Sequence, residues 1–304
     1  MSMLNINLCG IALKNPLVLA SGILGNTWSI LKRVADEGVG AVTTKSITLE
    51  PKKGYSNPVI VVLKYGIINA MGLPNPGINY FIEELKQHIN EIKAPIIVSL
   101  AGSTVKEFEK LIEKVSEIKI SAIELNLSCP HYSGYGIEVL SDRKLVSQIV
   151  DAVCSITSTP ILVKVSAHHP NILDIVNLVL KHGARGIVAI NTMRAMAIDV
   201  YAKKPILSNV FGGLSGPAIH PIAVRVVYEI YREHPEVDIV GVGGVESWID
   251  AVEFLLAGAR AVGIGTVIAS RGFSAIKEIK RGIVQYLRSE GYSSVKEIIG
   301  LAHS

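Results

Sequence analysis

Cysteine is scarce in this chain of 304 residues, which contains only Cys9, Cys129 and Cys154. Three thiols form no paired disulfide framework, and none stands in the CxxC spacing typical of zinc or iron–sulfur sites. The histidines form no HxxxH or HExxH pattern either. We therefore expect no metal site, and a reducing compartment such as the cytoplasm.

Long apolar runs and clustered positive charge are missing as well. No segment reaches the roughly 18 uninterrupted apolar residues of a membrane helix, and residues 1–8 lack the basic and then apolar order of an export signal. The net charge of +4 is spread along the chain. We expect neither a membrane anchor nor an extended nucleic-acid surface, whereas a small anionic ligand stays compatible.

Aromatic residues make up only 6% of the chain, while 49% is hydrophobic and consists largely of Ile, Val, Leu and Ala. This composition is typical of parallel strands that are buried on both faces. Apolar runs that fit strands recur at eight places: Leu17–Ser21, Ala41–Ser46, Ile96–Leu100, Ala122–Leu127, Ile161–Val165, Gly186–Asn191, Ile239–Val242 and Ala261–Gly265. Helical patterns separate them without a linker. We predict an α/β fold, a (β/α)8 TIM barrel formed by one domain over residues 1–304.

Helical spacing is clearest in two segments. The apolar positions are Ile78, Phe81, Ile82, Leu85 and Ile89 in the first, and Val105, Phe108, Leu111, Ile112 and Val115 in the second. Thr104 with Glu107 predicts a capping box at the start of the second helix. Two connections are long, residues 47–77 and 193–216, and we expect loops there that act as lids, binding walls or contact surfaces.

Polar residues fall at the carboxyl ends of the predicted strands, where barrels carry their chemistry. They are Ser21, Lys45, Ser99, Asn126, Lys164 and Asn191. A lysine beside a strand is usually a solvated edge charge. Two lysines at matching strand ends, Lys45 and Lys164, favour contact with a ligand, because a buried ammonium needs an anionic or electron-rich partner.

Amide side chains gather near the same ends. Asn69, Asn126 and Asn191 could each serve only to form a turn. Together with Thr192 they suit a planar ring that bears carbonyl and N–H groups.

Glycine-rich turns follow the last two predicted strands, as Gly241-Val242-Gly243-Gly244 and Gly263-Ile264-Gly265-Thr266. Glycine at such turns can serve packing alone, but a pair in these places predicts a phosphate site, because the turns expose backbone N–H groups. Gly-Gly-Leu-Ser-Gly at 212–216 adds a third loop rich in donors.

The stretch Glu124–His131 ends a strand with an amide, a hydroxyl and a thiol in quick succession. Cys129 fits either a small buried hydrophobe before a proline turn or a proton acceptor in a working site. His131 is open between ligand contact and local loop bonding. His168 and His169 fit ordinary loop histidines after the fifth strand.

These motifs in combination resemble class 1 dihydroorotate dehydrogenases. The resemblance rests on Asn-Leu-Ser-Cys-Pro at 126–130, Thr-Lys-Ser at 44–46, Asn-Ala-Met-Gly-Leu-Pro-Asn-Pro-Gly at 69–77, the 212–216 segment and the paired glycine turns. Cysteine rather than serine at 129 separates the chain from the membrane-bound class 2. Thr48-Leu49-Glu50-Pro51 and the Leu214–Ala223 region are most similar to the catalytic subunit of the B type.

The resemblance implies an FMN barrel that oxidises dihydroorotate to orotate in pyrimidine (UMP) biosynthesis. Cys129 would remove the C5 proton as general base while hydride leaves C6 for the flavin. The implied substrate residues are Lys45, Asn69, Met71, Gly72, Leu73, Asn126, His131, Asn191 and Thr192. The implied FMN residues are Ala20, Ser21, Gly22, Thr44, Lys45, Ser46, Ser99, Asn126, Lys164, Val165, Gly216, Gly243, Gly244, Gly265 and Thr266.

The chain departs from the family pattern at His131 and Ser99, where many members carry asparagine. The B-type resemblance also implies a homodimer, and a heterotetramer with a subunit that carries FAD and a 2Fe–2S cluster and passes electrons to NAD. This chain has no cysteine quartet and no strand–GxGxxG–helix fingerprint of its own.

Other functions stay open at this stage. The pyrimidine-reducing module of dihydropyrimidine dehydrogenase shares Asn-Leu-Ser-Cys-Pro-His, and an A-type enzyme would use fumarate. A tRNA dihydrouridine synthase would need a basic helical addition. A non-catalytic barrel that binds a phosphorylated ligand would not need Cys129 or the two lysines.

Overall fold

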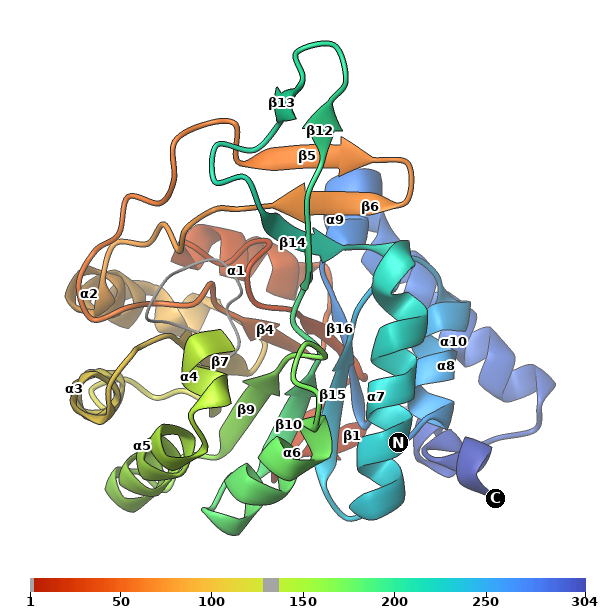
Figure 1. Cartoon of the computed structure of the whole chain (residues 1–304). Helices are drawn as coiled ribbons and strands as arrows, with labels where there is room; N and C mark the ends of the chain where they lie inside the picture. The colour runs from red at the N-terminus through yellow and green to blue at the C-terminus, as the bar shows by residue number, and fades with distance from the viewer. Residues whose placement is uncertain (1–2, 128–136) are drawn as a thin grey trace.

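The architecture is a closed parallel barrel surrounded by helices (Figure 1). The computed structural model describes residues 3–127 and 137–304. Within them, eight strands close in the order β10-β15-β16-β3-β4-β7-β8-β9. Their bounds are β3 Leu17–Leu19, β4 Ala41–Thr43, β7 Ile96–Leu100, β8 Ala122–Asn126, β9 Ile161–Val165, β10 Gly186–Ala189, β15 Asp238–Val242 and β16 Ala261–Ile264. The predicted (β/α)8 barrel is confirmed.

Some predicted strands run past the observed ends. The prediction extended from Ala41 to Ser46, whereas β4 stops at Thr43. Beyond this end the Lys45 N–H donates to the Gly25 carbonyl at 3.1 Å, whereas the N–H groups of Thr44 and Ile47 still donate to carbonyls of β7, at 2.9 Å each. The regular ladder is therefore interrupted at Lys45.

Helices pack on the outside of the strands, and each buries one apolar face. Their bounds are α1 Trp28–Asp36, α2 Ile78–His88, α3 Val105–Val115, α4 Ile137–Ser141, α5 Arg143–Ile156, α6 Ile172–Lys181, α7 His220–Glu233, α8 Trp248–Leu256, α9 Thr266–Arg271 and α10 Ser274–Ser289. In α3 the buried residues are Phe108, Leu111, Ile112 and Val115, which confirms the predicted helical spacing. Short 3-10 turns lie at η1 Ile89–Glu91, η2 Pro217–Ile219, η3 Val295–Ile298 and η4 Leu301–His303.

The cap of α3 differs in part from the prediction. The Thr104 hydroxyl accepts from the Glu107 N–H at 3.2 Å, as a capping box requires. The Glu107 carboxylate does not return to Thr104. It accepts instead from the Ser103 N–H at 2.7 Å and the Ser103 hydroxyl at 2.8 Å, two donors that a single carboxylate oxygen can satisfy at once.

The two long connections form a second sheet, although we expected loops there. This cap sheet has the order β11-β14-β6-β5 and is antiparallel, with Gly213 opposite Asn69. Its strands are β5 Ile60–Leu63, β6 Gly66–Asn69, β11 Met193–Ala195 and β14 Gly212–Ser215. It crosses one end of the barrel, and the hairpin of β12 Ile198–Asp199 and β13 Lys204–Pro205 projects beyond it (Figure 1).

The opposite end of the barrel carries the hairpin of β1 Ile6–Leu8 and β2 Ile11–Leu13. Leu8 is fully buried, and the Cys9 thiol that follows it lies 3.3 Å from the Arg185 carbonyl at the start of β10. Among the described residues, no helix combines the length and the apolar character needed to cross a membrane.

Candidate functional site

Three buried polar side chains stand at or just after the carboxyl ends of the barrel strands β4, β8 and β9. Lys45, Asn126 and Lys164 are 6%, 7% and 4% exposed. Asn126 and Lys164 are opposite each other in the β8–β9 register. The Lys164 amine donates to the Ser21 hydroxyl at 2.9 Å, a residue that follows β3 across the barrel. Two ammonium groups held this deeply require negative or electron-rich partners.

A series of hydrogen bonds links Asn126 through two serines to a carboxylate. Asn126 Nδ2 donates to Ser46 Oγ at 2.8 Å, and Ser46 Oγ lies 2.9 Å from Ser99 Oγ. Ser99 Oγ donates its one hydrogen to Glu124 Oε1 at 2.7 Å. Since Ser99 has no second hydrogen, Ser46 must donate to it, and the chain runs one way from the amide to the carboxylate. This direction sets the Asn126 side chain with its nitrogen toward Ser46.

The side-chain oxygen of Asn126 contacts the segment that follows β10. Asn191 Nδ2 donates to Asn126 Oδ1 at 3.2 Å, and Asn191 Oδ1 accepts from the Thr192 N–H at 2.8 Å. Asn69 Nδ2 reaches the Gly213 carbonyl at 3.3 Å in the cap sheet. The structure thus brings Asn126, Asn191 and Thr192 together, whereas the contact of Asn69 lies within the cap sheet.

The segment Met71–Leu73 is shaped by a residue outside the predicted set. Asn75 Nδ2 donates to the Leu73 carbonyl at 2.7 Å, and Asn75 Oδ1 accepts from the Gly77 N–H at 3.0 Å. Leu73 has φ of 55°, an uncommon conformation for leucine. The Met71 carbonyl accepts from the Tyr55 N–H at 3.0 Å. These contacts present the backbone of the segment in one conformation.

The glycine turn after β15 has no room for a side chain. Gly243 and Gly244 have φ of 146° and 67°. A Cβ at Gly244 would lie 2.6 Å from the Gly216 carbonyl oxygen, so the two predicted loops are in direct contact. Gly216 itself has φ of 100°. The turn at Gly265 is roomier, because a Cβ there would meet its nearest neighbour at 3.9 Å.

Most of the remaining predicted residues lie near the ends of the barrel strands, and two lie outside the described residues. Thr44 is buried, and its hydroxyl accepts from the Ser99 N–H at 2.9 Å. Ala20, Ser21, Gly22, Val165 and Thr266 lie at or just after the carboxyl ends of barrel strands, as the strand bounds require. Cys129 and His131 lie outside the described residues.

The other two cysteines lie away from this mouth. Burial, with the nearby Asp238 carboxylate, raises the pKa of Cys9 to about 12. Burial also raises the pKa of Cys154, on α5. Neither thiol has the environment of a proton acceptor.

The sequence analysis assigned no role to three residues of this region: Glu124, Asn75 and His220. Glu124 had a usable signal, because it stands two residues before Asn126 on a strand and so shares its face of the sheet. Asn75 lies in the motif at 69–77, but its partners depend on the folded loop. His168 is also more than a loop histidine, since its Nε2 accepts from the Arg194 N–H.

The fold and these groups define a class of protein, a (β/α)8 barrel whose mouth holds amines, amides and glycine turns for a small anionic ligand. Comparison with known sequences identifies the family. The family described as dihydroorotate dehydrogenase matches residues 3–287. The chain belongs to the dihydroorotate dehydrogenase family, as its motifs predicted.

Individual relatives cover nearly the whole chain. A protein of Pyrococcus abyssi named dihydroorotate dehydrogenase B (NAD(+)), catalytic subunit, is 53% identical over 303 residues, 99% of each chain. A protein of the same name from Methanocaldococcus jannaschii is 45% identical over 99% of this chain and 98% of its own. A relative from Aeropyrum pernix, whose name reads dihydroorotate dehydrogenase A (fumarate), is 44% identical over 99% of this chain and 97% of its own.

Proposed function

We propose that this chain oxidises dihydroorotate to orotate in pyrimidine biosynthesis, acting in the cytoplasm as one catalytic barrel domain over residues 1–304. The observation that carries the proposal is the convergence of the buried Lys45, Lys164 and Asn126 at the carboxyl ends of the strands. Membership of the dihydroorotate dehydrogenase family supports it.

The amides account for recognition of the substrate ring. Dihydroorotate presents carbonyl and N–H groups in one plane, and asparagine offers both a donor and an acceptor. Asn126 and Asn191 are locked to each other at 3.2 Å, so both are oriented before a ligand arrives. Asn69, Thr192, His131 and the backbone of Met71, Gly72 and Leu73 complete the proposed substrate site. Lys45 matches the carboxylate of the substrate.

The same mouth fits FMN. Gly243, Gly244, Gly265 and Gly216 provide backbone N–H groups at turns without side chains, which suits a phosphate. Lys164, with its amine on the Ser21 hydroxyl, can stabilise negative charge at the edge of the flavin ring. Ala20, Gly22, Thr44, Ser46, Ser99, Val165 and Thr266 complete the proposed site. Bound FMN supplies the acceptor for the hydride that leaves C6 of the substrate.

The chain itself supplies the proton acceptor. Cys129 takes the C5 proton in this proposal, and as a thiolate it is the stronger base. Asn126, three residues before it, is held by the chain of hydrogen bonds that ends on Glu124. Ser99 therefore contributes through its support of Asn126, whatever further contact it makes with the flavin.

The electron acceptor belongs to the proposal too. Relatives named dihydroorotate dehydrogenase B (NAD(+)), catalytic subunit, favour NAD as the acceptor. In this proposal the electrons reach NAD through a partner subunit that carries FAD and a 2Fe–2S cluster, as the resemblance of the sequence implies. The A-type name of the Aeropyrum pernix relative, at 44% identity, keeps fumarate as the second candidate.

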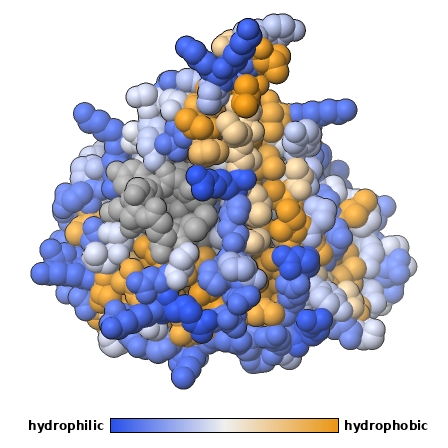
Figure 2. All heavy atoms as spheres, viewed as in Figure 1, coloured by the Kyte–Doolittle hydropathy of each residue, from blue (hydrophilic) through white to orange (hydrophobic). Residues whose placement is uncertain are grey.

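We also propose that two copies of the chain form a homodimer through the cap sheet. Along β5 the side chains of Ile60 and Val62 are 50% and 77% exposed, although an edge strand in water usually carries charge there. On the projecting hairpin Val200 and Tyr201 are 73% and 94% exposed. Figure 2 shows apolar residues gathered around this projection and down the face below it. Exposed apolar surface of this kind is typical of a subunit interface. A single-chain mass in light scattering would contradict the homodimer.

The function is tested by the absorbance of the purified protein under anaerobic conditions. We expect a flavin spectrum that bleaches when dihydroorotate is added and does not bleach with dihydrouracil, which lacks the carboxylate. Replacing Lys45 by alanine should slow bleaching by dihydroorotate, whereas Lys110→Ala, at an exposed position of α3, serves as the control. Absence of flavin, or faster bleaching by dihydrouracil, would overturn the assignment.

A further inference from the structure

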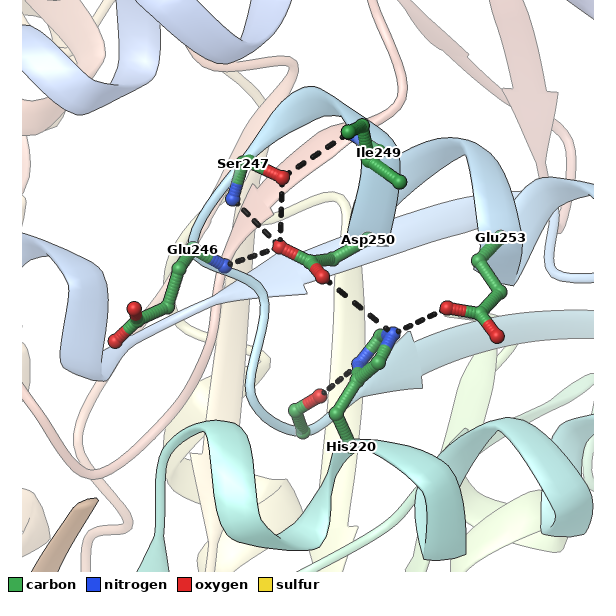
Figure 3. A network of polar contacts seen from close by, with 7 residues as sticks. His220, Glu246, Ser247, Ile249, Asp250 and Glu253 are labelled. Atoms are coloured by element: carbon green, nitrogen blue, oxygen red, sulfur yellow. Dashed lines mark hydrogen bonds and ion pairs between the residues drawn. The ribbon is translucent and has the colours of Figure 1, made fainter. Parts of the chain in front are cut away.

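A buried histidine lies directly behind the glycine turn proposed to hold phosphate. His220 is the first residue of α7 and is 8% exposed. Its Nδ1 lies 2.7 Å from the Gly243 carbonyl oxygen, and its Nε2 lies 3.0 Å from Glu253 Oε2 on α8. The ring also packs edge-on against Phe254 at 4.9 Å. Figure 3 shows the ring reaching from α7 to the two acidic side chains of α8.

Both partners of the ring are acceptors. A carbonyl oxygen has no proton to give, so Nδ1 must carry a hydrogen and donate it. A carboxylate oxygen likewise accepts, so Nε2 must also carry a hydrogen to bond Glu253. A ring that donates from both nitrogens is an imidazolium, with a positive charge behind the turn.

The contact with Gly243 determines where the next N–H points. In a planar trans peptide the carbonyl of Gly243 and the N–H of Gly244 point in opposite directions. Because the carbonyl is drawn toward His220, the Gly244 N–H is turned away from it. A Cβ at Gly244 would lie 2.8 Å from His220 Cβ, so the turn rests directly on the start of α7.

Two carboxylates among the described residues face the ring, and both come from α8. Asp250 Oδ1 is 3.9 Å from Nε2, but the other oxygen of Asp250 accepts from the Ser247 N–H at 2.7 Å and caps the helix. Glu253 is therefore the direct partner. The side chain of Glu246 points away from the ring in Figure 3.

We propose that His220 is a positioning residue of the phosphate site. Its Nδ1–H holds the Gly243 carbonyl so that the Gly244 N–H faces the phosphate of the flavin, and its positive charge adds to the attraction for that phosphate. This inference rests on the proposed function, because it takes FMN as the ligand.

Comparison of FMN with riboflavin isolates the phosphate. The flavin is removed, and each ligand is titrated back while its fluorescence quenching is followed. We expect His220→Ala to weaken FMN at least about tenfold, as for a lost hydrogen bond to a charged group. Riboflavin affinity should change little. His220→Asn should restore much of the FMN preference, because its amide nitrogen can take the place of Nδ1. The control is His234→Ala, just past the other end of α7.

The outcomes distinguish the two proposals. A parent protein that binds neither flavin overturns the proposed function. A parent protein that prefers FMN, with an unchanged FMN to riboflavin ratio in a folded His220→Ala, overturns the role of His220. If the alanine variant does not fold, an unchanged ratio in a folded His220→Leu, which fills the same space without a hydrogen-bond donor, does the same.

Discussion

At the mouth of this barrel, the hydrogen-bond donors and acceptors of single residues determine how the side chain of Asn126 is oriented. Glu124 can only accept in its bond from Ser99, so it orders the serines between itself and Asn126. Ser99 connects the two ends of this series, because its hydroxyl lies between Ser46 and the Glu124 carboxylate. Such buried networks orient a side chain only when every member is satisfied.

At this scale the sharpest prediction concerns Cys129. Replacing it by alanine should leave the flavin bound but slow its reduction by dihydroorotate at least about a hundredfold, the usual scale of a lost general base. Orotate should still bind, because amides hold it. Stopped-flow absorbance measures the reduction, and Cys154→Ala is the control, since that thiol lies on α5. Reduction at the parent rate would remove Cys129 from the mechanism.

Among the elements, the segment after β10 depends on a histidine of the β9 connection. His168 Nε2 accepts from the Arg194 N–H, at the strand β11 that follows Thr192. An imidazole can accept only when that nitrogen is unprotonated. Burial, and then the charge of Arg194, lowers the pKa of His168.

This lowered pKa gives a prediction for binding. The contact is complete above the unfolded pKa of about 6.5 and is lost as pH falls through the lower folded value. Orotate affinity, read from the flavin spectrum, should therefore hold at about pH 6.5 and weaken only at lower pH, as His168 is protonated and the Asn191–Thr192 segment loosens. His168→Gln offers an acceptor that does not titrate, and its affinity should stay level over the same range. An equal decline in both proteins would place the titrating group elsewhere.

Regular elements differed in how well they could be foreseen. All eight barrel strands were predicted, because a strand buried on both faces is a continuous apolar run. The cap sheet was not, since its strands are only three or four residues long and pair segments far apart, as Asn69 with Gly213. The helix α3 was predicted with its Thr104 cap, but the Glu107 carboxylate found Ser103 as a nearer donor.

For the whole molecule, the path of the electrons depends on groups that this sequence lacks. The sequence has no cysteine quartet and no dinucleotide-binding fingerprint, so the isolated protein should reduce NAD poorly with dihydroorotate as donor. Addition of a subunit with FAD and an iron–sulfur cluster should raise that rate strongly. The rise of NADH absorbance with time measures that rate. Efficient NAD reduction by the chain alone would contradict this, and efficient fumarate reduction would favour the A-type function.

The sequence by itself determined the barrel, the strand ends that carry polar groups and the family. These follow from local patterns, because an apolar run, a helical period or a glycine turn is complete within a few consecutive residues. Only the tertiary structure decided which donor meets which acceptor: Ser99 with Glu124, Asn191 with Asn126, and His220 with Gly243. These partners are 25, 65 and 23 residues apart, and their meeting depends on the register and closure of the barrel, which no local pattern encodes.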